Sequence, residues 1–409
     1  MLSSGKVRKT LFAAIILAVA VSIYLFNQSP EIKYNEQGGS GHVSYEKAKV
    51  LKVVSENLEK DAPSGMTYGT QELEIEISSG ERKGEIHTIK NYMSSYNNVY
   101  AQEGQSIVVN VNAADAKSYM VSVYSPYRAP YLLAMALLFF GLLWWIGGMK
   151  GLKSALGIIF TFACIIFLFI PMLYRGYSPI FASVLIVVLT TCITLLLLNG
   201  WSTKSAAAIF GTLIGITIAG LLAYIFGEWV QISGFNTNEV EVLLVVAEET
   251  GLQLKGLLFA GILLATLGAV IDVGISIASS IHEVYMTNRS LSKKELFMSG
   301  INVGRDMMGT MANTLLLAFT GTSLTSLILL YSIGVTFTQA TNMNMVTIEV
   351  VQGITGCIGV VLTVPIVAFI SSRIIPKYEK STDQPDGQAT SAAAASTTLA
   401  AASAQEVQA

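Results

Sequence analysis

Long apolar segments recur along most of this chain and restrict its fold more than any other feature. A bilayer core of about 30 Å is crossed by around 20 apolar residues in helical form, because each backbone polar group is then satisfied within the segment. Only 13% of the residues are charged and 52% are hydrophobic, whereas a soluble domain has about 25% charged residues. The sequence therefore predicts a polytopic α-helical membrane protein with about eight transmembrane helices. The candidate spans are residues 10–26, 130–148, 155–173, 178–199, 205–226, 256–281, 308–334 and 350–375.

The first span follows a basic leader, Lys6-Val-Arg-Lys9. A signal peptide cleaved after Ala18-Val-Ala20 is one reading. Apolar residues continue to Phe26, however, which favours an uncleaved anchor. The predicted organisation is a cytoplasmic leader and N-terminal membrane anchor (1–26), an extracytoplasmic β-rich domain (27–129), a seven-helix membrane domain (130–376) and a disordered cytoplasmic tail (377–409).

Lysine and arginine residues are concentrated in alternate loops. Short loops that stay in the cytoplasm carry an excess of these residues, and the opposite short loops here hold only Arg175 and Lys255. This pattern predicts that both termini are cytoplasmic and that residues 27–129 lie outside the cell. The cytoplasmic set is Lys6, Arg8, Lys9, Lys150, Lys153, Lys204, Arg289, Lys293, Lys294, Arg305, Arg373, Lys377 and Lys380.

The predicted outer domain shows the period-two pattern of β-strands. In segment 72–77, Leu73, Ile75 and Ile77 alternate with glutamates, so one face of the strand is apolar. About five such strands predict a small all-β barrel or sandwich. The expected strands are residues 49–54, 72–77, 84–89, 106–111 and 119–124.

Composition excludes several classes of protein. The formal net charge is −2, and no basic cluster of the kind that binds nucleic acid is present. The three cysteines all fall in apolar segments, and the three histidines are scattered, so we expect neither a disulfide framework nor a metal site. No Walker A, zinc-protease or Gly-x-Ser-x-Gly motif occurs. We therefore expect no cofactor and no enzymatic activity.

One apolar span contains an acidic residue. Asp272 stands a little to the cytoplasmic side of the middle of segment 256–281, where an ionisable side chain costs at least about 2.5 kcal/mol and is a functional candidate. Helical steps from Asp272 meet only small or polar residues, so we expect this stripe to face protein or water rather than lipid. The stripe consists of Gly261, Ala265, Gly268, Asp272, Ser276, Ser279 and Glu283.

Two further spans carry comparable stripes. Ser292-Lys-Lys-Glu295 resembles a capping box and predicts the start of a helix that runs into span 308–334. Three polar seams on consecutive helices predict a bundle interior lined by polar groups. The second stripe is Asn302, Asp306, Gly309, Asn313 and Thr320, and the third is Glu349, Gln352, Gly356, Gly359 and Thr363. The transport or coupling candidates are Asp272, Ser276, Asn302, Arg305, Asp306 and Asn313, and the helix-packing candidates are Gly268, Gly309, Gly356 and Gly359.

Each of these features also has a purely structural interpretation. Asp272 would pair with Arg305 or cap a bend, and the Arg305-Asp306 pair would anchor the topology at the membrane surface. Glycine and serine stripes are most often packing surfaces. Gly211-x-x-x-Gly215 in the fifth span is a weak signal for helix contact.

Two intramembrane motifs carry a family resemblance, GAVIDVGISIASS at residues 268–280 and NVGRDMMGTMANTLLLAF at residues 302–319. They resemble the YibE/F-like family of bacterial multipass membrane proteins, and the extra anchor and β-rich domain resemble its YibE-type member. Arg128-Ala-Pro130, the loop at 148–153 and Ala247–Leu252 add to the likeness. The resemblance implies the bacterial cytoplasmic membrane and a YibF-type membrane partner. It supplies no substrate, reaction or catalytic residue.

Three functions are compatible with these observations. A secondary transporter would use Asp272 for proton or cation coupling, since glycines flank it as in interrupted transporter helices. A membrane scaffold or regulatory subunit would use the outer domain and the polar seams to bind a membrane partner. An intramembrane aspartyl protease would pair Asp272 with Asp306, although the Gly-x-Gly-Asp sequence typical of such proteases is missing.

Overall fold

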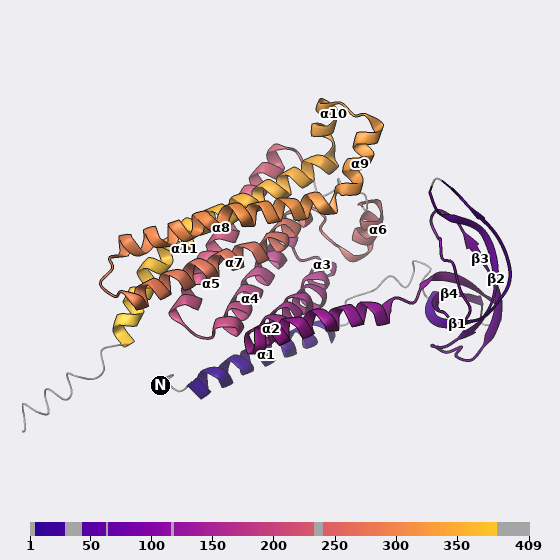
Figure 1. Ribbon diagram of the computed structural model, residues 1–409, viewed down its shortest axis with the longest axis horizontal. Helices are drawn as coiled ribbons and strands as arrows, with labels where there is room; N and C mark the ends of the chain where they lie inside the picture. Colours follow the sequence, from indigo (N-terminus) through magenta and orange to yellow (C-terminus); the bar gives the residue numbers. More distant parts are fainter. Residues whose placement is uncertain (1–4, 29–42, 63, 116–117, 233–239, 383–409) are drawn as a thin grey trace, which may run out of the picture. The chain divides into compact units, whose positions relative to one another are not determined.

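The computed structural model describes residues 5–28, 43–62, 64–115, 118–232 and 240–382 (Figure 1). The chain divides into two compact units, Lys33–Gly148 on the one hand and Met1–Ile32 with Met149–Ala409 on the other. Most of the predicted tail and part of the predicted outer domain lie outside the described residues. The elements are α1 (Gly5–Gln28), β1 (Val43–Lys60), β2 (Thr67–Ile77), β3 (Ile86–Met93), β4 (Ser106–Asp115), β5 (Ser118–Pro126), α2 (Ala129–Cys164), the π-helical turn η2 (Ile165–Phe169), α3 (Ile170–Tyr174), α4 (Pro179–Asn199), α5 (Thr203–Trp229), α6 (Val240–Thr250), α7 (Leu257–Thr287), α8 (Lys293–Thr322), α9 (Leu324–Ile333), α10 (Phe337–Asn342) and α11 (Asn344–Thr382).

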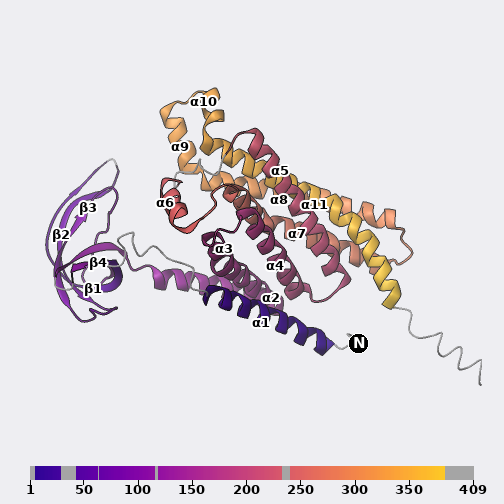
Figure 2. The same ribbon diagram turned by 180° about the vertical axis from the view of Figure 1, so that it is seen from behind.

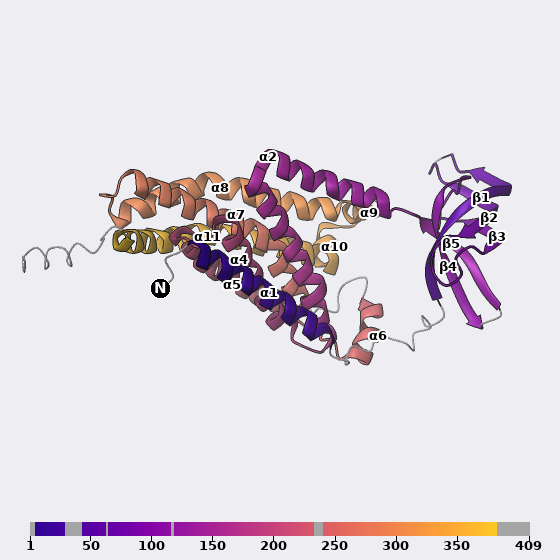
Figure 3. The same ribbon diagram turned by 90° about the horizontal axis from the view of Figure 1, so that it is seen from below.

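The strands form one antiparallel sheet in the order β3-β2-β1-β4-β5 (Figure 3). The alternation expected in segment 72–77 is present, with Leu73, Ile75 and Ile77 buried. The register of β1 against β2 shifts between Val50 and Lys52 and again between Val53 and Ser55. Such bulges increase local twist and bend a strand. The unit is therefore a single strongly curved sheet rather than a closed barrel or a two-layer sandwich.

A loop segment completes the core of this curved sheet. Val99 and Ala101, which follow β3, are buried with the strand residues. The buried amides of Gln71 and Asn91 hold the segment, because Gln71 Nε2 donates to the Ala101 carbonyl (3.1 Å) and Asn91 Nδ2 donates to the Val99 carbonyl (2.7 Å). These bonds satisfy backbone groups that a strand partner would otherwise satisfy.

The two edge strands are bridged at one end. The Tyr119 hydroxyl on β5 donates to Glu85, just before β3, and lies 2.9 Å from His87 Nε2. Arg82 stacks on the Tyr119 ring, 3.5 Å from its centroid. The hydrogen bond from Tyr119, followed by that from His87, lowers the pKa of the Glu85 carboxyl below its ordinary value of 4.5. The cluster thus ties the edges through a carboxylate that must stay ionised.

The helical unit is organised around α7, which packs against α4, α5, α8 and α11. Its large apolar side chains, among them Leu267, Val270 and Ile277, are buried in a core shared with these neighbours. In Figure 1, α5, α7, α8 and α11 lie side by side. The capping box predicted at Ser292 and Glu295 is confirmed at the start of α8.

The first helix contacts the same unit near its C-terminal end (Figure 2). Asn27 Nδ2 donates to the Phe167 carbonyl in η2 at 2.7 Å. The Arg175 guanidinium, just beyond α3, lies 3.7 Å from the centroid of the Phe26 ring and donates to the Phe26 carbonyl. Since this arginine satisfies the end of α1, the helix is docked rather than free along its whole length.

Five helices of the described chain are long and apolar enough to cross a membrane, or six if the bent pair α8 and α9 counts as one span. The expected spans 130–148 and 155–173 follow each other without a loop in the helical stretch Ala129–Tyr174. Gly148 breaks its helical geometry with φ 54° and ψ −135°, values that favour glycine. The apolar part of α1, Ala14–Gln28, is shorter than the others. The count of eight therefore stays a prediction.

Small residues bring α5 and α11 into close contact. A Cβ atom at Gly211 would come within 2.5 Å of Val367 Cγ2 and 3.0 Å of the Val367 Cα, and one at Gly215 would overlap Thr363. One at Gly359 would come within 2.5 Å of Ala219 Cβ. Small residues on facing helices allow the two backbones to approach closely. This increases van der Waals contact, which stabilises helix pairs in a bilayer because lipid is as apolar as the helices themselves.

We predict that Gly211→Val destabilises the helical unit by about 1–3 kcal/mol, because the new side chain meets the α11 backbone as well as a flexible methyl. The thermal unfolding midpoint of the purified full-length protein in detergent measures the effect. Gly227→Val is the matched control on α5, since open space surrounds Gly227. Equal midpoints for the two variants would contradict the assignment of this contact.

We also predict that acid weakens the bridge between the sheet edges. Since the folded-state pKa of Glu85 is depressed, the bridge stabilises the fold above about pH 4.5 and loses this effect as pH falls through the lower folded-state value. Hydrogen exchange of β3 in the full-length protein, corrected for intrinsic rates, should accelerate over this range. Tyr119→Phe removes the main cause of the shift and should flatten the pH dependence. An unchanged pH profile would show that the bridge plays no part.

Candidate functional site

The polar stripe of α7 lies on the outside of the described helical unit. Asp272 is exposed, and so are Gly261, Ala265 and Gly268 on the same face. A Cβ atom at Gly261 or Gly268 would meet open space. The bulky residues on the other faces of α7 form the core instead. The expectation that this stripe turns into the bundle interior is therefore wrong for a single chain, because the apolar side chains of α7 fill that interior.

The polar stripe of α8 also lies on the outside of the described helical unit. Asn302, Arg305, Asp306 and Asn313 are exposed, and Ser276 of α7 is partly exposed. In the part of the chain that the structure describes, no hydrogen bond or ion pair joins the side chains of Asp272, Arg305 and Asp306. The expected polar interior is thus a polar exterior, and the alternative in which Asp272 pairs with Arg305 is not observed.

The two stripes lie at similar heights. Consecutive helices α7 and α8 meet where a Cβ atom at Gly300 would come within 2.6 Å of Ile281 Cδ1. Equal steps back along α7 and forward along α8 from this contact bring Asp272 level with Gly309. Asp306 and Asn313 lie about one turn to either side of that level.

The four glycines proposed for helix packing divide into two pairs. Open space surrounds Gly268 and Gly309, which belong to the exposed stripes. Gly356 and Gly359 of α11 lie in close contacts, and a Cβ atom at Gly356 would come within 2.5 Å of Thr266 Cγ2 on α7. The third polar stripe is therefore largely a packing surface.

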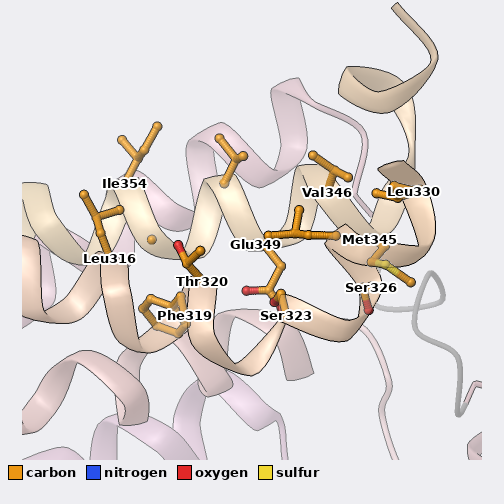
Figure 4. Close-up of a pocket in the computed structure, with 13 residues that line it drawn as sticks. Leu316, Phe319, Thr320, Ser323, Ser326, Leu330, Met345, Val346, Glu349 and Ile354 are labelled. Atoms are coloured by element: carbon orange, nitrogen blue, oxygen red, sulfur yellow. The ribbon is translucent and has the colours of Figure 1, made fainter. Parts of the chain in front are cut away.

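A pocket of about 400 Å³ lies between the bend joining α8 to α9 and the N-terminal part of α11. This volume is within the range of small-molecule sites. Figure 4 shows the Glu349 side chain directed toward the bend, where Ser323 and Thr320 lie. Glu349 is the only ionisable residue in the lining. The lining consists of Leu316, Phe319, Thr320, Ser323, Ser326, Leu327, Leu330, Met345, Val346, Glu349, Val350, Gly353 and Ile354.

The bend explains why a pocket forms at this place. Helix α8 ends at Thr322, and α9 departs from it by 61° after Ser323. Gly334, with φ 70°, ends α9 and reverses the chain. About two turns before the bend, α8 faces Gly353 of α11, where a Cβ atom would come within 3.2 Å of Leu316 Cδ2. The absence of a side chain at Gly353 leaves room on this side of the pocket.

The Glu349 carboxyl is the chemically distinctive group of this pocket. Its Oε2 atom is buried and has no hydrogen-bond partner among the described residues. Most of the surrounding side chains are apolar, with the hydroxyls of Thr320, Ser323 and Ser326 as the other polar groups. A buried polar oxygen without a partner is unfavourable, although the Glu349 residue as a whole is partly exposed. The arrangement can therefore accept a cation or a hydrogen-bond donor.

Sequence reasoning placed Glu349 in the third polar stripe but did not select it as a site residue. The signal was present, since Glu349 is an acid in the second turn of a long apolar helix. What the sequence did not reveal was the sharp bend of the preceding span, because segment 308–334 contains no proline and its run Gly321-Thr-Ser323 is only a weak kink signal.

A second, more polar pocket of about 590 Å³ lies between α5 and the start of α7. Lys255 Nζ and Glu228 Oε1 approach to 3.7 Å in its lining. Both side chains are more than half exposed, so this pair contributes little energy. A satisfied ion pair in an open site distinguishes this pocket from the one at Glu349.

Two family models match this sequence. The model described as YibE/F-like protein matches residues 135–377, and the model described as YibE/F family N-terminal domain matches residues 42–126. No curated protein and no solved structure matches the chain. The first model covers more than half of the chain and includes both intramembrane motifs, and the second coincides with the curved sheet. The chain belongs to the YibE/F-like family.

Proposed function

We propose that this chain is a secondary transporter, or permease, of the bacterial cytoplasmic membrane, with its binding site at the bend between α8 and α9. The observation that carries the proposal is the unpartnered Glu349 carboxyl in the pocket at a broken span. Transporters often bind substrate and coupling ions where a membrane helix is interrupted, because freed polar groups and an open volume occur together there.

The carboxyl has a role that packing alone does not require. A carboxyl oxygen without a partner in a mostly apolar pocket is unfavourable, and a bound cation would satisfy it. Binding of a coupling cation there would link the movement of that ion to the movement of the solute. Asp272 remains a second coupling candidate, but its exposure on α7 requires a water-filled space or a partner subunit beside it.

The proposed topology has eight spans, cytoplasmic termini and the curved sheet outside the cell. The asymmetric distribution of lysine and arginine supports it. For eight spans, α1 and the two parts of the stretch broken at Gly148 each count as one, and α8 with α9 forms another. The Glu349 pocket then opens toward the outer end of the helical unit.

The alternative function is a subunit of a larger membrane assembly, either a scaffold or a regulator. The exposed polar faces of α7 and α8 favour it, because Asp272, Asn302 and Asp306 are costly against lipid. Small residues beside Asp272 allow a partner helix to approach closely. We propose a YibF-type membrane protein as this partner, and the two functions are compatible in one complex.

We propose no catalytic activity for this chain. An aspartyl protease needs two carboxyls close enough to share a proton. Asp272 and Asp306 are exposed on different helices and share no hydrogen bond among the described contacts, which gives this reading no support.

The transport proposal predicts that Glu349→Gln lowers the rate of pH-gradient-driven solute uptake into proteoliposomes at least about tenfold, since the amide retains the shape but cannot ionise. The solute is first selected with the wild-type protein from a panel of ionised metabolites. Glu228→Gln, an exposed acid at the end of α5, is the control. Transport is contradicted if wild-type liposomes take up no solute faster than empty ones, and the site is contradicted if Glu349→Gln retains full activity.

The assembly proposal predicts that the α7 stripe is shielded from lipid in the native membrane. A nitroxide attached to a single cysteine at Ala265 should be poorly accessible to lipid-dissolved oxygen, whereas one at Leu221, which is 57% exposed on α5, should be accessible. The three native cysteines are first replaced. Equal oxygen accessibility at the two positions would rule out a partner on this face.

A further inference from the structure

The Glu349 pocket has an uneven chemical character that selects for one kind of ligand. One acidic group stands among the otherwise uncharged and mostly apolar residues that line this volume of about 400 Å³. No lysine, arginine or histidine belongs to the lining, so the described residues supply no cation to the carboxylate. A ligand that satisfies this site brings its own positive charge and an apolar body.

The rim of the pocket indicates how such a ligand enters. Leu316 of α8, Leu327 of α9, and Val350 and Ile354 of α11 line the pocket and are each at least 40% exposed. These residues belong to helices that are apolar enough to lie in the membrane. The opening is therefore bordered by side chains that suit contact with lipid, and an apolar ligand reaches it without leaving the bilayer.

The position of the acid along α11 fits the same ligand. Glu349 lies in the second turn of a candidate span, near one end of the helix, whereas Gly353 and Ile354 lie one turn deeper. Amphipathic molecules keep a charged head near the membrane surface and an apolar body in the hydrocarbon region. A ligand cation beside Glu349 and a ligand body against Leu316 and Ile354 meet both requirements.

We propose that this pocket binds a lipophilic monocation, with the cation paired to the Glu349 carboxylate and the apolar body among the side chains of α8, α9 and α11. The hydroxyls of Ser323 and Ser326 add hydrogen-bond acceptors for an ammonium group. This inference rests on the proposed transport function and names its substrate class. The ammonium group of an amine-bearing lipid is the same cation as that of a free amphipathic amine, but in phosphatidylethanolamine a phosphate accompanies it.

The test measures binding of radiolabelled tetraphenylphosphonium to the full-length protein in dodecyl maltoside, an uncharged detergent. Tetraphenylborate, which has the same shape and the opposite charge, is the matched ligand control. The two ions are measured in separate titrations, and saturable binding of tetraphenylphosphonium with no saturable binding of tetraphenylborate is expected. Glu349→Gln should weaken binding about tenfold to hundredfold, which corresponds to the loss of one charged contact.

Two variants keep the result interpretable. Ser326→Phe fills the pocket while the carboxylate remains, and it should also abolish binding, which carries the test if Glu349→Gln does not fold. Glu228→Gln, in the other pocket, should bind as the wild type does. Equal affinity for the cation and the anion, or undiminished binding by Glu349→Gln and Ser326→Phe, would overturn the proposal.

Further arms separate the ligand sources and the two proposals. Displacement of the probe by added phosphatidylethanolamine would identify a lipid head group as the occupant, and displacement by dodecylamine alone would identify a free amphipathic amine. If the cation binds at Glu349 but the proteoliposomes take up no solute faster than empty ones, transport is wrong and the site stands. If another solute is transported in a Glu349-dependent way while the cation fails to bind, only the substrate class is wrong.

Discussion

The close approach of α5 and α11 at Gly211, Gly215 and Gly359 is the contact on which the rest of the helical unit depends. It brings two helices far apart in sequence together and leaves α7 to pack across both. The large apolar side chains of α7 fill the space that remains, together with Ile216 of α5 and Val360 and Val364 of α11. A larger residue at any of the three glycines would push α5 and α11 apart.

The orientation of α7 determines where the small and polar residues of this helix lie. With its bulky face in the core, its small residues and Asp272 are left on the outside, at the height of the polar face of α8. Polar side chains on the outside of a membrane helix are unfavourable in contact with lipid, and contact with water or with another protein removes this cost. The first intramembrane motif of the family resemblance therefore has two faces, since Val270, Val273 and Ile277 lie in the core and Asp272 lies on the exposed side.

The pocket at Glu349 has a different origin. It depends on the 61° bend after Ser323, which separates α9 from the direction of α8, and on the glycine opposite in α11. No basic residue belongs to the lining, so the described pocket residues supply no cation to the Glu349 carboxylate. The curved sheet of the other unit shows the opposite arrangement, since Glu85 there is satisfied by Tyr119, His87 and Arg82. Glu85 has partners that hold the edges of the sheet together, whereas Glu349 Oε2 has no hydrogen-bond partner among the described residues.

The sequence by itself determined the helices, the strands, the capping box at Ser292 and the alternation of Leu73, Ile75 and Ile77, because these depend on local periodicity and hydrogen bonding. It also identified the glycine pair of α5 as a contact. Only the tertiary structure decided which face of α7 is covered and where Glu349 points. The physical reason is that lipid and a helical core are equally apolar, so the apolar face of a membrane helix suits either environment. Which face meets protein is decided by how well side chains of distant helices fit together.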